Sequence, residues 1–334
     1  MATQGTNVLT LMDWAKRRKP DGGIDTIIEM LSQTNGLLTD MLFKEGNLPT
    51  GNRTTIRTGL PTVYWRLLNQ GVQPSKSTTA QIDESCGMLE AWSEVDVELA
   101  KLESNVAEFR LSEASAFIEA MNQEMASTFF YGNSGTSPEE FNGLSVRYGD
   151  LTAANARNII DGGAAAGQTD CSSIWCVGWG ENTIHGIYPK GSTAGLERED
   201  LGIQTVETQA GASGSVSGNR LRVYQEIFRW KCGVVLKDWR YVVRVGSIDI
   251  SANNADYIDL MVKMKNRIES LQACRPVIYM NRTIEERLEL LRRADVTTGG
   301  GLTYDNVDGV MTMSFRGIPI RRVDALLESE TSLN

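Results

Sequence analysis

The chain has 334 residues, of which 41% are hydrophobic and 22% charged, with a formal net charge of -9 and an isoelectric point near 4.9. This composition can bury a core in one elaborated domain or two smaller ones, so it excludes a disordered chain. The acidic balance argues against a sequence-reading nucleic-acid binder, because such proteins carry a basic surface that neutralises phosphates.

Targeting and metal-binding signals are missing from the sequence. No segment approaches the roughly twenty apolar residues that cross a bilayer. Residues Met1–Thr10 are polar, unlike a signal peptide. We therefore expect a protein that stays in the cytoplasm where it is made and that binds no membrane. The five cysteines are scattered and odd in number, and His185 is the single histidine, so we expect no disulfide framework, no metal site and no cofactor.

Residues 1–48 predict an N-terminal arm with short helices. A basic stretch is followed by turn-forming residues, and the helical pattern behind it is interrupted by Gly36. The apolar positions of this pattern are Ile27, Ile28, Leu31, Leu38, Met41 and Leu42.

Residues 49–95 predict an extended β-hairpin loop. Short β-prone, polar runs alternate there with proline and glycine turn signals. The hairpin has too few apolar residues to form a core of its own, so it should rest on something else, such as a neighbouring subunit. Tyr64, Trp65, Arg66 and Lys76 are the expected intersubunit contacts, because aromatic residues and arginine are common interface anchors. The alternative is that Trp65 tucks under its own hairpin.

The clearest helix is expected over residues 112–131. Ser112 is a suitable N-cap, and Gly132 would supply a left-handed stop. A stripe with helical spacing connects these ends, and ordinary core packing explains it. Its members are Ala114, Phe117, Ile118, Met121, Met125 and Phe129.

Strands dominate the middle of the chain. Residues 173–188 are β-prone, whereas residues 191–218 are polar and glycine-rich and predict an ordered but exposed excursion. Residues 221–250 alternate arginine with apolar residues, which is typical of strands that have one wet face and one buried face.

The C-terminal part alternates helices and strands. A helix is expected over residues 256–273 and a buried strand over 276–280. Thr283 would cap a second helix that ends at Arg293, with Glu286 at the capping-box position. Two further strands are expected, and the last of them, Gly317–Arg321, should lie at a sheet edge because it contains proline.

Catalytic patterns are weak. His185 lies in a β-prone run, and the adjacent acids Asp83 and Glu84 point in different directions. The glycine-rich stretch at 162–167 has no lysine after it, as a phosphate-binding loop would. We therefore expect no enzyme and no catalytic residue. A hydrolase using His185 is the alternative, and its sign would be His185 in a deep pocket beside an acid and a nucleophile.

Several motifs, taken in their order along the chain, resemble major capsid proteins of tailed bacteriophages with the Hong Kong 97-like fold. The exit from the long helix resembles that family, and the later motifs resemble capsid proteins of short-tailed phages such as the Bordetella phage group. The motifs are Phe129–Asn133 with Phe141–Leu144, Tyr188–Gly191, Asp238–Arg244, Ile278–Arg282 and Gly317–Asp324.

This resemblance implies an α+β fold with an arm, an extended loop, a spine helix, a peripheral domain and an axial domain. The long strands precede the axial-looking segment, which suggests a circularly permuted version of the fold. The implied division is an arm at 1–48, a loop at 49–95, a peripheral domain at 96–150 and 195–250 with the spine helix at 112–131, and an axial domain at 151–194 and 251–334.

The implied function is that of a shell subunit. Copies would form hexamers and pentamers and close an icosahedral head around double-stranded DNA, which they would hold without sequence-specific binding. The shell would assemble in the host cytoplasm and become the virion capsid. Scaffolding, portal and cement or decoration proteins are the further partners implied, and the acidic charge predicts an inner face that is acidic or neutral. An encapsulin-like cellular compartment is the alternative within the same fold.

Overall fold

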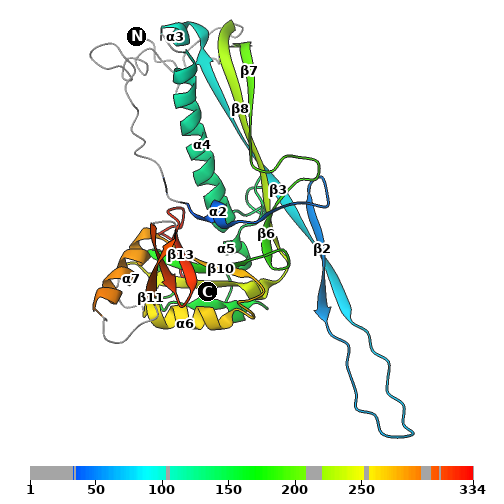
Figure 1. Ribbon diagram of the computed structural model, residues 1–334. Helices are drawn as coiled ribbons and strands as arrows, with labels where there is room; N and C mark the ends of the chain where they lie inside the picture. Colours follow the sequence, from blue (N-terminus) through cyan, green and yellow to red (C-terminus); the bar gives the residue numbers. More distant parts are fainter. Residues whose placement is uncertain are drawn as a thin grey trace. The chain divides into compact units, whose positions relative to one another are not determined.

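The computed structural model describes residues 33, 35–102, 106–207, 220–251, 256–294, 302–307 and 310–333 (Figure 1). Most of the arm expected over 1–48 lies outside the described residues, as does the segment 208–219. The elements in chain order are α2 (Leu37–Asp40), β1 (Phe43–Glu45), β2 (Gly51–Gly59), β3 (Thr78–Asp96), α3 (Val97–Lys101), α4 (Val106–Tyr131), α5 (Leu144–Arg147), η1 (Ala156–Asn158), β4 (Ile159–Asp161), β5 (Cys171–Trp179), β6 (Ile184–Tyr188), β7 (Leu196–Glu207), β8 (Arg220–Leu236), η2 (Trp239–Tyr241), β9 (Val242–Asp249), α6 (Tyr257–Arg267), β10 (Arg275–Met280), α7 (Arg282–Ala294), β11 (Leu302–Val307), β12 (Val310–Phe315) and β13 (Ile318–Arg322).

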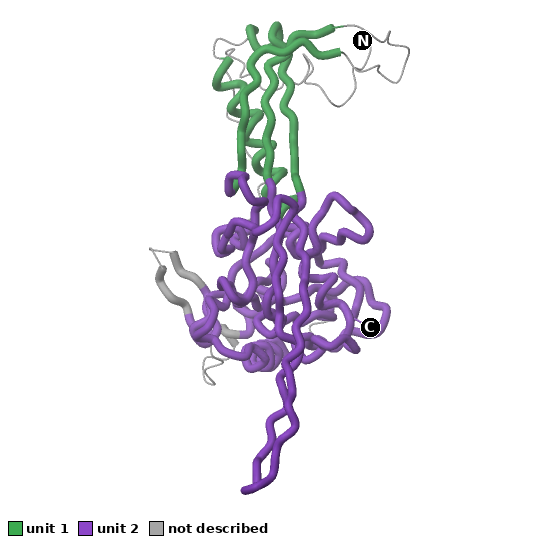
Figure 2. Tube along the Cα trace, turned by 90° about the vertical axis from the view of Figure 1, so that its right-hand side faces the viewer, with its two compact units in different colours: residues 1–33, 88–125, 195–230 green, residues 34–87, 126–194, 231–334 purple. Residues whose placement is uncertain are grey.

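The chain divides into two compact units (Figure 2). Unit 1 comprises Met1–Gln33, Met88–Met125 and Gly195–Trp230, and unit 2 comprises Thr34–Gly87, Ala126–Ala194 and Lys231–Asn334. Three long elements, α4, β3 and β8, contribute residues to both units.

Unit 1 packs one side of α4 against strands. Ala114 and Met121 are buried with Phe228 of β8, and the ring of Phe117 stacks on Phe228 with centroids 5.9 Å apart. Ile118, which we expected in the same stripe, is 44% exposed.

The start of α4 differs from the prediction. Within the described residues the helix begins at Val106, six residues before Ser112. Ser112 is therefore not the cap. Its hydroxyl donates to the Phe109 carbonyl at 2.8 Å, a bond back to the preceding helical turn.

The end of α4 is as predicted, at Tyr131, but for another reason. Gly132 is not among the glycines with positive φ. A methyl group at Gly132 would lie 2.5 Å from the Phe141 carbonyl oxygen, and the Gly143 amide donates to the Gly132 carbonyl at 2.8 Å. Glycine is required here because the returning chain packs directly against the helix end.

Unit 2 is built on a mixed sheet. β5 lies next to β10 and also pairs with β9, in both cases antiparallel, while β10 pairs with β13 in parallel. β13 is not an edge strand as expected, because it also pairs with β12. Pro319 is tolerated there because the ladder with β10 begins one residue later, at Ile320.

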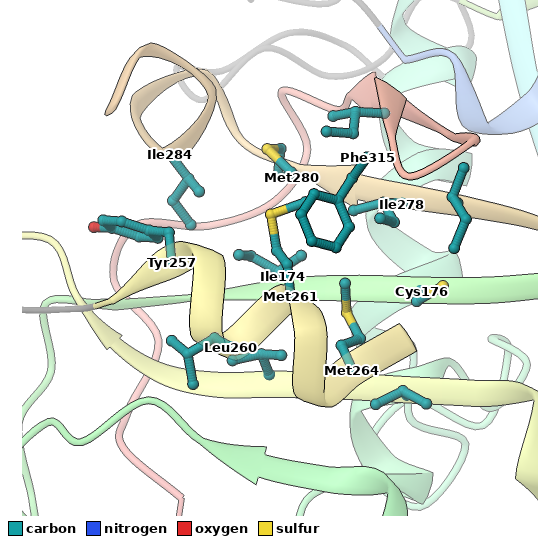
Figure 3. Close-up of a cluster of buried hydrophobic side chains, with 14 of the residues drawn as sticks. Ile174, Cys176, Tyr257, Leu260, Met261, Met264, Ile278, Met280, Ile284 and Phe315 are labelled. Atoms are coloured by element: carbon teal, nitrogen blue, oxygen red, sulfur yellow. The ribbon is translucent and has the colours of Figure 1, made fainter. Parts of the chain in front are cut away.

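Two helices cover this sheet and form the core of unit 2 (Figure 3). Tyr257, Leu260, Met261 and Met264 are buried on one face of α6, the spacing of an amphipathic helix. Their partners include Ile174, Cys176, Ile278, Met280, Ile284 and Phe315.

The caps of these helices correct the predicted boundaries. The side chain of Asp256 accepts from the Asp259 amide at 3.1 Å and caps α6, which ends at Arg267 and is shorter than predicted. Asn281, not Thr283, caps α7, because its side-chain oxygen accepts from the Ile284 amide at 2.9 Å. The Thr283 hydroxyl donates to Glu328 instead.

The polar segment after residue 191 also differs from the prediction. Its first part is the strand β7, which pairs with β8 in antiparallel register from Leu196↔Trp230 to Glu207↔Arg220. No residue of β7 is buried, so the prediction of an ordered, exposed segment holds for residues 196–207, but the strand itself was not predicted. A bulge between Asp200 and Gly202 interrupts the register, and Gly202 adopts φ 69° there.

Candidate assembly surface

The extended loop is an antiparallel hairpin whose ladder stops before its tip. β2 pairs with β3 from Gly51↔Ser85 to Gly59↔Thr78. Residues 60–77 continue beyond the last pair without forming strands and are almost entirely exposed. Figure 2 shows this ribbon extending from the rest of unit 2. The sequence explains the shape, because residues 51–59 and 78–85, which form the paired part of the hairpin, are mostly polar and supply no apolar face.

Large apolar side chains gather at the tip without a partner. We call residues 60–77 the loop tip. Trp65 is 103% exposed and Leu68 is 94% exposed. Soluble monomers rarely expose contiguous apolar surface of this kind unless it binds something. The remaining exposed apolar members are Leu60, Val63, Tyr64, Leu67 and Val72.

The four predicted contact residues all lie in the loop tip. Tyr64, Trp65 and Arg66 occupy the outgoing arm, and Lys76 occupies the returning arm. The exposure of Trp65 rules out the alternative in which it tucks under its own hairpin. Arg66 Nε donates to the Gln70 carbonyl at 2.7 Å, which closes the turn at the end of the tip. That these residues contact a neighbouring subunit stays a prediction.

Sequence reasoning missed the leucines and valines of the tip. Leu67 and Leu68 form the turn itself, and Leu60 and Val63 precede it. The available signal was their position between Gly59 and Gly71, in a stretch too short and too polar to enclose them. The tip is also free of acids, since no Asp or Glu occurs between residues 58 and 82 of a chain with a net charge of -9.

The base of the loop is held by a buried ion pair. Arg147 of α5 donates through Nη1 and Nη2 to the two carboxylate oxygens of Glu84 at 2.5 and 2.6 Å. The side chains of Glu84 and Arg147 are 7% and 18% exposed. The next residue, Asp83, makes its own bidentate pair with Arg53 at 2.6 Å, but in solvent. The Arg53 guanidinium lowers the pKa of Asp83.

His185 lacks the surroundings that a hydrolase needs. It is buried in β6, opposite Val235 of β8. Burial, together with the charges of Lys237 and Lys44, lowers its pKa from 6.5 to about 4. A ring kept neutral and shielded between strands is not placed in an open pocket, so the position does not favour a catalytic histidine.

The cysteines and the acids of the described residues also form no recognisable reactive site. All five cysteines are free thiols. Burial raises the pKa of Cys86 to about 11 and that of Cys232 to about 12, which opposes thiolate chemistry at neutral pH. Among the described residues, no group of three or more His, Cys, Asp or Glu side chains could hold a metal ion.

No helix within the described part of the chain has the length and apolar character needed to cross a bilayer.

Comparison with known proteins gives matches over nearly the whole chain. The family model described as Major capsid protein GP7 matches residues 19–334. A chain in the structure of bacteriophage epsilon15 is 30% identical, with a TM-score of 0.77, and the alignment covers 100% of this chain and 99% of that one.

More distant likenesses accompany it. The capsid of bacteriophage JBD30 is 10% identical, with a TM-score of 0.47 and coverage of 89% of this chain and 93% of that one. The SrpI encapsulin of Synechococcus elongatus PCC 7942 is 10% identical, with a TM-score of 0.43 and coverage of 73% and 98%. Both are too distant to support a functional argument. No curated protein sequence matches.

Proposed function

The chain belongs to the GP7 family of major capsid proteins, and from this premise we propose that its extended loop joins neighbouring subunits in the shell. The family role is that of a capsid shell protein of a bacteriophage, which is a structural role and not an enzymatic one. The resemblance noted in the sequence, to tailed-phage major capsid proteins, is therefore confirmed, and the encapsulin alternative is not favoured.

The exposed apolar loop tip is the observation that carries the contact proposal. Burying a side chain the size of Trp65 or Leu68 contributes about 1.5–3 kcal/mol before the entropy of association is subtracted. The chain gains this contribution only if another surface covers the tip. Symmetry repeats the same contact around every capsomer, so modest individual interfaces add up over a closed shell.

The charge of the tip supports the same conclusion. Arg66 and Lys76 are its charged residues, both basic, while the chain as a whole is acidic. A basic, apolar tip suits an acidic surface, and another copy of the same chain provides one. Tyr64, Trp65, Arg66 and Lys76 therefore stand as the proposed intersubunit contacts, with the exposed leucines around them.

Further parts of the assembly follow as proposals. Subunits gather as hexamers and pentamers, and the icosahedral shell encloses double-stranded DNA that it does not read. Assembly takes place in the host cytoplasm, with scaffolding and portal proteins as separate partners. The division into peripheral and axial domains and the circular permutation stay predictions.

The test is substitution at the tip. In the full chain, Trp65→Ala with Arg66→Ala should reduce the yield of closed particles by tenfold or more, measured by sedimentation and electron microscopy, while unassembled subunits keep their thermal midpoint. Arg57→Ala, on the exposed ladder of β2, is the control. Unchanged particle yield and particle stability in the double variant would exclude the tip as a contact.

A further inference from the structure

Along the β2–β3 ladder of the extended loop, burial begins at one pair of neighbouring residues. Going from the tip toward the body of unit 2, Gly51 and Glu84 are the first buried residues of β2 and β3. They lie together, because Gly51 pairs with Ser85 and Asn52 pairs with Glu84. Every residue from 52 to 83 is exposed or half-buried. Nearer the tip, the side chain of Asn47 also bonds the backbone N–H and carbonyl of Arg53, each at 2.7 Å, in the exposed part of the chain. The buried support of the loop therefore begins at the register of Gly51 and Glu84.

Close backbone packing holds the base within the plane of the sheet. A methyl group at Gly51 would lie 1.9 Å from the Glu84 carbonyl oxygen, and one at Gly233 of β8 would lie 2.7 Å from the Ser85 carbonyl oxygen. β3 is thus fixed between its two neighbours. Contacts of this kind do not resist bending out of the plane, because side chains project from the two faces of a sheet.

Glu84 supplies the restraint from the face. Its carboxylate meets both terminal nitrogens of Arg147, and Nη2 of Arg147 also donates to the Asn142 carbonyl at 3.2 Å. A bidentate pair fixes direction as well as distance. The pair therefore ties the strand to the segment that follows the end of α4.

Because the loop is long, a small change of its direction at the base displaces the tip by a large distance. Gly51 and Leu68 are separated by 17 residues, which corresponds to about 55 Å for an extended ribbon rising about 3.3 Å per residue. A tilt of about 10° at the base would then displace the tip by about 10 Å, more than the width of a side-chain contact. The direction set at Glu84 decides where the tip arrives.

We propose that the Glu84–Arg147 ion pair is a positioning clamp, which aims the extended loop at its binding surface on a neighbouring copy without touching that copy. The proposal rests on the proposed contact of the loop tip. It assigns Glu84 and Arg147 an effect on assembly geometry that exceeds their effect on subunit stability.

The neighbouring ion pair offers a matched control. Asp83 adjoins Glu84 in the sequence, points to the opposite face and also binds an arginine through two bonds. Its partner Arg53 belongs to β2, so this pair links the two strands of the loop to each other and not to the rest of unit 2. It moves with the loop and cannot aim it.

The experiment compares Glu84→Gln with Asp83→Asn in the full chain. Glu84→Gln should lower the fraction of closed shells by tenfold or more and broaden their size distribution in electron micrographs. Asp83→Asn should stay within twofold of the unsubstituted chain. Arg147→Lys keeps the charge but loses the planar bidentate geometry, so it should show an intermediate loss, and it carries the test if Glu84→Gln does not fold.

A distance measurement on unassembled subunits separates positioning from stability. Nitroxide labels at Gln73→Cys in the tip and Asn266→Cys on α6 occupy exposed positions of unit 2. The half-buried Cys86 and Cys274 label slowly, because burial raises the pKa of each to about 11. An identically treated chain without the added cysteines is the control. The label-to-label distance distribution should broaden in Glu84→Gln and stay unchanged in Asp83→Asn.

The outcomes distinguish this proposal from the proposed function. Equal behaviour of Glu84→Gln and Asp83→Asn in both measurements would overturn the clamp. So would a lower thermal midpoint of Glu84→Gln with an unchanged distance distribution and unchanged shell sizes. Normal assembly of the Trp65→Ala, Arg66→Ala variant would instead exclude the proposed tip contact. The label-to-label distance distribution of unassembled subunits would still test the clamp.

Discussion

The core of unit 2 and the extended loop both contain large apolar side chains, but the core buries them and the loop exposes them. Met261 and Phe315 are fully buried between helices and sheet, whereas Trp65 and Leu68 are almost fully exposed. The core closes on itself because α6, α7 and the sheet each present an apolar face to the others. The loop tip has side chains of comparable size, and no described residue of its own unit encloses them.

This difference teaches where each region obtains its stability. The core is stabilised by folding, since its apolar surface leaves water when the single chain folds. The loop tip can lose its apolar exposure only in an assembly. Substitutions in the core should therefore act on the free energy of unfolding of the subunit, and substitutions at the tip should act on particle formation.

The buried ion pair beside the core should give the strongest effect on unfolding. Arg244 Nη2 lies 2.9 Å from Glu330 Oε2, and both side chains are at most 5% exposed. Glu330→Ala would leave the guanidinium buried without its counter-charge, so we expect a loss of about 3–5 kcal/mol in the free energy of unfolding. Urea denaturation of unassembled subunits measures it. Lys263→Gln breaks an exposed pair with Asp259 and should cost less than about 0.5 kcal/mol.

A cavity in the core should lower the free energy of unfolding slightly less than the loss of Glu330 does. Met261→Ala removes a fully buried side chain between α6 and the sheet, as Figure 3 shows. We expect a loss of about 2–4 kcal/mol in the free energy of unfolding by the same denaturation assay. A loss below about 1 kcal/mol would mean that the core is less tightly packed than the burial indicates, and it would weaken the comparison.

Acid should act on the body of unit 2 through His185. Its pKa is about 4 in the folded chain and ordinarily 6.5, so the unfolded chain binds the proton first as the pH falls. The stability associated with the neutral ring is complete above pH 6.5 and declines as the pH falls toward 4. Thermal midpoints of unassembled wild-type and His185→Gln subunits across this range should converge as the pH is lowered. Parallel curves would contradict the assignment.

The tip should show the smallest effect on unfolding. Leu68→Ser changes a residue that is 94% exposed, so the free energy of unfolding of the unassembled subunit should change by less than about 0.5 kcal/mol. Particle yield should fall in the same variant. A loss of more than about 1 kcal/mol would show that Leu68 packs against its own chain.

The sequence predicted the elements with regular periodicity and failed where tertiary contacts decide. The apolar stripe of α4 and the buried strand β10 could be predicted, because their apolar spacing matches the helix and strand periods. Ser112 looked like a cap because only local chemistry was visible, and Gly132 looked left-handed although close packing of Phe141 explains it. β7 escaped prediction because its partner β8 lies more than twenty residues away at the start of the pairing.

The candidate surface was predictable in location but not in mechanism. The hairpin and the residues Tyr64 to Arg66 follow from turn signals and from a shortage of apolar partners. The Glu84–Arg147 pair could not be foreseen, since 63 residues separate its members. The sequence indicated only that the adjacent acids Asp83 and Glu84 point in different directions, and the fold shows that Glu84 is buried whereas Asp83 lies in solvent.

Cryo-electron microscopy of assembled particles of this chain tests the account most directly. The map should show the tip of every extended loop, including Trp65 and Leu68, covered by a neighbouring copy, with Glu84 and Arg147 in contact at the base. A map in which residues 60–77 fold back onto their own subunit, or stand in solvent with no neighbour against them, would contradict it.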